Sequence, residues 1–155
     1  MTTHTLPAQR IAALRTAMKA HNIDIYIVPT SDPHNNEYVA DRWKGREWLS
    51  GFTGSAGTLV VAHEKAALWT DSRYFLQAEK ELAGSGIELM RMGGEGVPSE
   101  QEWIKDVLGY TLEEGERLSF KNVDCSPQIG FDFMSVSYEP QIDLVYDFAD
   151  FLVNI

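Results

Sequence analysis

The sequence contains a single cysteine, Cys125, among its 155 residues. One cysteine cannot form an internal disulfide, and it cannot supply a zinc site built from several cysteines. Neither a histidine nor another cluster of reactive side chains lies beside it in the sequence. We therefore interpret Cys125 as a small, half-buried hydrophobic residue and not as a reactive thiol.

Basic residues and long apolar runs are also scarce. Thirteen Lys and Arg face 23 Asp and Glu, which gives a formal net charge of −10 and argues against binding to nucleic acid or to an anionic membrane surface. No apolar run approaches the roughly 20 residues that span a bilayer, and the opening MTTHTLPAQR lacks the order of a secretory signal. We expect a cytoplasmic protein.

The 44% of hydrophobic residues suits one ordinary domain over residues 1–155 with a real core. Apolar spacing and turn residues predict interleaved helices and strands. Helices are expected at 6–22, 46–50, 71–84, 98–108 and, weakly, 126–137; strands at 23–29, 58–62, 66–70, 86–92, 118–122 and 139–145. This alternation predicts an α/β fold, a mixed β-sheet flanked by helices, with 58–62 and 66–70 forming a hairpin.

Two helix starts carry recognisable caps. Asp71 can cap the helix that follows it, which Gly84 would end, and Ser99 with Glu102 has the spacing of a capping box. The segment between the first strand and the second helix, residues 31–45, has turn residues at its start and aromatic residues at its end, and we expect a long ordered surface loop.

Residues 51–58 read GFTGSAGT, a density of glycine that suits a phosphate cradle, a nucleophile's turn or a tight structural corner. A phosphate loop needs a lysine and a following helix, whereas this octet follows a short helix and enters a strand. Ser55 also lacks the strand-to-helix elbow of hydrolases. The pattern favours a structural corner, in which glycine permits positive φ and close backbone approach.

Two groups of polar residues are candidates for binding. Asp32, His34 and Glu37 lie within six residues and could offer metal ligands, although a turn capped by Asp32, with the other two facing solvent or a partner, explains them more simply. Arg73 falls in the first turn of its helix, where the macrodipole disfavours a cation. It could pair with Asp71 or another acid, or it could grip a carboxylate or carbonyl of a substrate.

The segments SDPHNNEYV, GFTGSAGT and WTDSRYFLQAEKEL, taken in this order, resemble the N-terminal domain of Xaa-Pro aminopeptidases in the creatinase and prolidase superfamily. The resemblance implies a ribonuclease-H-like topology and a separate catalytic domain with two divalent metal ions, usually manganese. No cofactor is expected in this segment itself. It further implies that Arg73 reaches toward the peptide-binding site, and that Asp32, His34 and Glu37 lie near the active-site mouth or a domain contact.

On this resemblance we expect a non-catalytic N-terminal domain of an enzyme that releases the residue preceding proline. The segment YDFADFLVNI ends the sequence without a cap or polar tail, so we expect a fragment of a longer protein. Its partners would be a proline-containing peptide, the protein's own C-terminal domains and a second copy in a homodimer. The alternatives are a stand-alone peptide- or protein-binding module, and the equivalent domain of a prolidase or creatinase.

Overall fold

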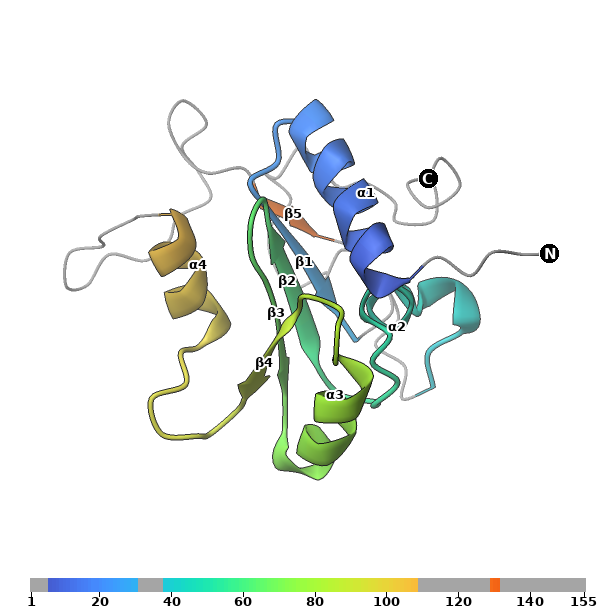
Figure 1. Cartoon of the computed structure of the whole chain (residues 1–155), viewed down its shortest axis with the longest axis vertical. Coiled ribbons are helices and arrows are strands. Elements are labelled where there is room, and N and C mark those ends of the chain that lie inside the picture. The colour runs from blue at the N-terminus through green and yellow to red at the C-terminus, as the bar shows by residue number, and fades with distance from the viewer. Residues whose placement is uncertain (1–5, 31–37, 109–128, 132–155) are drawn as a thin grey trace.

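The computed structural model describes residues 6–30, 38–108 and 129–131, which form one mixed sheet with helices on both faces (Figure 1). The strand order is β4-β3-β2-β1-β5. The strands are β1 (Ile25–Pro29), β2 (Thr58–Ala62), β3 (Ala66–Thr70), β4 (Glu88–Arg91) and β5 (Ile129–Phe131). The helices are α1 (Pro7–Ala20), α2 (Gly45–Ser50), α3 (Phe75–Glu81) and α4 (Glu100–Leu108), with single 3-10 turns η1 (Asp41–Trp43) and η2 (Ser72–Tyr74).

Strand directions confirm the predicted mixed α/β sheet. β2 pairs antiparallel with both β1 and β3, so the expected hairpin is present. β4 runs parallel to β3, and β5 runs parallel to β1. The ribonuclease-H-like topology stays a prediction.

Two local predictions were wrong. We expected a weak helix over residues 126–137, but Ile129–Phe131 forms a strand in register with Ile25–Ile27. The backbone partners of this strand lie about a hundred residues earlier in the chain, so local periodicity could not reveal them. The helix expected to run to Gly84 ends at Glu81, and Gly84 adopts φ 75° in the turn beyond it.

Several other expectations lie wholly or partly outside the described residues. They are the strands at 118–122 and 139–145, the apolar C-terminal segment, and residues 31–37 of the expected loop. Within the described part, none of the helices is long and apolar enough to cross a membrane.

Strand residues alternate between two apolar layers, as the pleat requires. Tyr26 and Val28 of β1 face one layer together with Leu59 and Leu68, whereas Ile25 faces the other layer. The first layer is covered by α1, α2 and α3, and the second by α4 (Figure 1). The sheet is therefore the middle of three layers.

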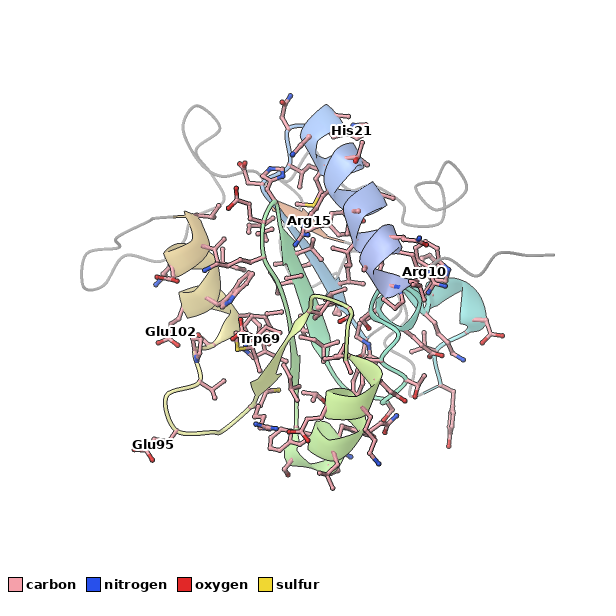
Figure 2. The ribbon with its side chains drawn as sticks, viewed as in Figure 1. Arg10, Arg15, His21, Trp69, Glu95 and Glu102 are labelled. Carbon is pink, nitrogen blue, oxygen red and sulfur yellow. The ribbon has the colours of Figure 1, made fainter. Side chains whose placement is uncertain are left out.

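The start of α4 is fixed by the capping box that the sequence predicts. The Ser99 backbone amide donates to the Glu102 carboxylate at 2.8 Å, and the Glu102 amide donates to the Ser99 hydroxyl at 3.3 Å. Trp69 of β3 points toward this side of the sheet (Figure 2) and meets Trp103 edge to face, with ring centroids 5.6 Å apart. Its indole nitrogen donates to the Pro98 carbonyl at 2.8 Å. Both apolar and polar contacts thus seat α4.

Two arginines of α1 tie this helix to the rest of its layer. Arg10 lies over the Trp48 ring at 4.7 Å and donates to the Trp48 carbonyl. Arg15 donates to the Ala62 carbonyl at 2.8 Å, and partial burial lowers its pKa. The helix is consequently attached both to α2 and to the end of β2.

Candidate functional site

One edge of the sheet carries both Arg73 and the glycine octet, two features that the sequence singles out. Because β1 and β2 are antiparallel, Pro29 at the end of β1 pairs with Thr58 at the start of β2, which in turn pairs with Trp69 near the end of β3. Thr30 directly after β1, the glycine octet before β2 and the turn after β3 therefore meet there. We call the set Thr30, 51–58 and 71–74 the Arg73 edge.

The glycine octet is a structural corner, as predicted. Gly51 ends α2 with φ 76° in the left-handed region. A Cβ at Gly54 would lie 2.2 Å from the Phe52 ring, and a Cβ at Gly57 would lie 2.8 Å from the Trp69 carbonyl oxygen. Glycine is thus required by a turn at the first position and by close packing at the other two. The octet leads into β2 and not into a helix. It therefore lacks the helix N-terminus with which a phosphate loop binds its anion.

A buried cation, Arg46, holds this corner together. Its side chain is 5% exposed and lies over the Phe52 ring at 5.0 Å. One terminal nitrogen donates to the Thr30 hydroxyl at 3.0 Å, and the other donates to the Gly54 carbonyl. Burial lowers the Arg46 pKa to about 10. The nearby Glu47, Glu81 and Tyr74 act in the opposite direction and raise it.

Sequence reasoning missed Arg46. The residue occupies the second position of a short polar-looking helix, and an arginine there is normally solvated. The available signal was its place five residues before a glycine-rich segment, whose carbonyls can accept from a guanidinium.

Thr30 joins the end of β1 to the same corner. Its hydroxyl donates to the Gly57 carbonyl at 2.7 Å and accepts from the Gly57 amide at 2.9 Å. Thr70, at the end of β3, donates from its hydroxyl to the Ala56 carbonyl at 2.6 Å. The corner is consequently bonded to two strands, and the segment that carries Asp32, His34 and Glu37 starts from its anchored residue Thr30.

Asp32, His34 and Glu37 themselves lie outside the described residues. Their expected place near the active-site mouth or a domain contact stays a prediction.

Arg73 forms the ion pair that the sequence offered as one of its two interpretations. Its Nε donates to Asp71 Oδ1 at 2.9 Å and its Nη2 to Asp71 Oδ2 at 2.7 Å, a two-pronged arrangement. Asp71 also accepts from the Arg73 backbone amide at 3.0 Å, which caps η2 as expected. These hydrogen bonds lower the Asp71 pKa and raise the Arg73 pKa. The Arg73 side chain nevertheless remains 68% exposed.

Aromatic and hydroxyl groups surround this pair. The Arg73 guanidinium lies over the Tyr74 ring at 5.2 Å, and the Tyr74 hydroxyl is 2.6 Å from the Ser55 hydroxyl. Tyr74 also meets Phe52 edge to face at 6.1 Å. The turn that carries Arg73 is therefore packed against the glycine corner and against its buried ring.

Glu81 fastens α3 to the corner from the other side. Its carboxylate accepts from the Thr53 amide and hydroxyl, both at 2.8 Å, and from Gln77 at 3.1 Å. Partial burial raises the Glu81 pKa, but the hydrogen bonds from Thr53 and Gln77 and the charge of Arg46 outweigh it, so the pKa lies below its ordinary 4.5.

The described residues contain no group of three or more His, Cys, Asp or Glu placed to hold a metal ion. What this edge does offer is an exposed guanidinium on a rigid turn, with hydroxyls beside it. Such an arrangement can bind a carbonyl or an anion by hydrogen bonding.

The mixed sheet with helices on both faces defines an α/β domain. The chain belongs to the Creatinase/Prolidase N-terminal domain family, which matches residues 10–139.

The relatives are peptidases of much greater length. The chain is 60% identical over 86 residues to Aminopeptidase P2 of Arabidopsis thaliana, an alignment that covers 56% of this chain and 12% of that protein. Its structure is similar to that of X-prolyl aminopeptidase from Caenorhabditis elegans, a cytosolic enzyme with a di-nuclear active site. That match has a TM-score of 0.65 and 30% identity, and covers 83% of this chain and 20% of the other.

A third similarity concerns the fold alone. The N-terminal, creatinase/prolidase-like domain of a protein from Corynebacterium diphtheriae matches with a TM-score of 0.52 and 23% identity, over 84% of this chain and 81% of that one. These comparisons confirm the family resemblance and the α/β fold that the sequence predicts.

Replacing Gly57 with alanine tests the structural corner. The added Cβ would press on the Trp69 carbonyl, so we expect a loss of about 1 to 3 kcal/mol in the free energy of unfolding, measured with urea. Ser72→Ala, an exposed residue of η2, should change stability by no more than about 0.5 kcal/mol. Equal stability of Gly57→Ala and the wild type would contradict the packing described here.

Glu81→Gln tests the carboxylate that joins α3 to the corner. Because the folded pKa of Glu81 is depressed, its contribution should be present above pH 4.5 and disappear as the pH falls through the folded pKa. We expect the wild type to be about 1 kcal/mol more stable than Glu81→Gln at pH 7 and the difference to shrink below pH 4.5. Glu88→Gln, an exposed change of the same charge on β4, controls for net charge. A stability difference between the wild type and Glu81→Gln that stays constant from pH 7 to pH 3 would contradict the stabilising role of the ionised Glu81 carboxylate.

Proposed function

We propose that this chain is the non-catalytic N-terminal domain of a metal-dependent Xaa-Pro aminopeptidase, which releases the N-terminal residue that precedes proline. The observation that carries the proposal is the 60% identity to Aminopeptidase P2, combined with a family that is defined by its N-terminal position. The similarity in fold to the nematode X-prolyl aminopeptidase supports it.

In this proposal the catalytic domain lies outside residues 1–155. It carries out the chemistry and holds the two divalent metal ions, which the family resemblance implies are manganese. Residues 1–155 form one accessory domain that narrows the substrate cleft and contacts the other domains or a second subunit. The intact enzyme acts on proline-containing peptides in the cytoplasm; the nematode relative is described as cytosolic with a di-nuclear site, which supports both points.

Arg73 is the proposed substrate anchor of the domain. It is a permanent cation, it is 68% exposed, and its turn is fixed by Asp71 and by packing on the glycine corner. A group that is held rigidly yet open to solvent can hydrogen-bond a ligand without first being ordered. Asp32, His34 and Glu37 are proposed to line the same side, since their segment begins at Thr30 of the Arg73 edge.

The non-catalytic assignment is tested by comparing the peptidase activity of the 155-residue chain with that of the full-length enzyme. The folding of the shorter chain is checked by circular dichroism. We expect manganese-dependent hydrolysis of a Xaa-Pro-Xaa peptide only with the full-length protein, because the metal ligands lie in its catalytic domain. Hydrolysis by the 155 residues alone would refute the non-catalytic assignment. A full-length protein that binds the peptide without cleaving it would favour a binding module.

Arg73→Ala in the full-length enzyme tests the anchor. Loss of one charge-assisted hydrogen bond at an exposed site should lower kcat/KM for a proline-containing peptide by about tenfold, and Arg73→Lys should recover part of it. Lys80→Ala, which removes an exposed cation from α3, should leave kcat/KM within about twofold. Unchanged kinetics in Arg73→Ala would remove the proposed role.

A further inference from the structure

Asp71 occupies one of the edges by which the Arg73 guanidinium can bind a carboxylate. An arginine binds a carboxylate best through two parallel hydrogen bonds from one edge of its planar group. Here Nε and Nη2 form that edge, and both donate to the two oxygens of Asp71, at 2.9 Å and 2.7 Å. This edge of the guanidinium is thus already filled by a side chain of the domain itself.

Asp71 does not depend on Arg73's side chain for its position. It follows directly on β3, whose last residue, Thr70, is fully buried and donates to the Ala56 carbonyl. Its carboxylate also accepts from the Arg73 backbone amide at 3.0 Å, which orients it as the cap of η2. The Asp71 side chain is 34% exposed, against 68% for Arg73. The anion is therefore the better fixed member of the pair.

The donors of Arg73 that remain lie on its outer end: both N–H groups of Nη1 and the second N–H of Nη2. Among the described residues, none accepts a hydrogen bond from Nη1. A ligand that binds there sits close to the carboxylate of Asp71. A second carboxylate would be repelled by it, whereas a neutral carbonyl oxygen would accept the same hydrogen bond without that repulsion.

We propose that Asp71 is a specificity-determining residue, which makes Arg73 a receptor for a neutral peptide carbonyl and not for a terminal carboxylate. The inference rests on the proposed function, in which Arg73 faces the substrate. Peptides that continue beyond proline present an amide carbonyl where a Xaa-Pro dipeptide presents its charged C-terminus. The ion pair therefore selects longer peptides over free dipeptides.

The kinetic test compares Gly-Pro with its C-terminal amide, Gly-Pro-NH2, in the full-length enzyme. The wild type should prefer the amide, and Asp71→Asn should shift the ratio of kcat/KM values toward the free acid by about fivefold, because the repelling charge is gone while the side chain keeps its size. Asp71→Asn in an Arg73→Ala background should give no such shift. Asp106→Asn, the same chemical change on α4 against the other face of the sheet, should leave the ratio as in the wild type.

A binding measurement on the 155-residue chain separates this proposal from the proposed function. The Arg73 Nε–H resonance is followed by NMR during titration with N-acetylproline and with N-acetylprolinamide. N-acetylproline should perturb it clearly more in Asp71→Asn than in the wild type, whereas N-acetylprolinamide should perturb both alike. Equal responses of the two proteins to the carboxylate, or an unchanged kinetic ratio in Asp71→Asn, would overturn the role of Asp71. A wild-type enzyme that cleaves neither peptide would instead overturn the proposed function.

Discussion

The buried guanidinium of Arg46 is the contact on which the polar edge of this domain depends. A charged group with 5% exposure is costly unless its donors are used, and two of its nitrogens donate to Thr30 and to the Gly54 carbonyl. These bonds bring the end of β1 against the glycine octet. The close approach is possible only because Gly54 and Gly57 have no side chains to obstruct the Phe52 ring and the Trp69 carbonyl.

Contacts from this corner also fix the positions of exposed residues. Phe52 lies beneath the corner and contacts Tyr74, which carries the Arg73 guanidinium on its ring. Thr70 and Glu81 bond the same segment to β3 and to α3. An exposed arginine usually samples many rotamers, but here its turn is packed from below and its head group is held by Asp71. The domain can therefore present one oriented cation at the end of a sheet.

In the proposed function, this domain needs little more than such an oriented cation. It has to present a surface to the substrate in a fixed place, and a mixed sheet with helices on both faces provides the stiffness. The family to which the chain belongs, Creatinase/Prolidase N-terminal domain, occurs in relatives several times its length, and the chain spans 12% of the plant aminopeptidase that it matches. A specificity residue such as Asp71 would then act on a reaction carried out elsewhere in the same enzyme.

The sequence by itself determined the local features. Periodicity gave the helix over 7–20 and the hairpin of β2 and β3, and the side chains of Asp71, Ser99 and Glu102 gave their caps, because each depends on residues a few positions apart. The glycine octet was recognised as a corner by the order of its neighbours. Its place in the first turn of a helix singled out Arg73, and the family resemblance carried by the motifs added the expectation that it reaches toward a peptide.

Only the tertiary structure decided the features that join distant residues. The pairing of β5 with β1, the burial of Arg46 against Thr30 and Gly54, and the link from Glu81 to Thr53 cross large gaps in the sequence, and no local pattern encodes them. The Asp71 and Arg73 pair lay between these cases. Two residues apart, it was expected as one possibility, but its two-pronged geometry and the exposure of the arginine follow from the packing of the turn on the corner.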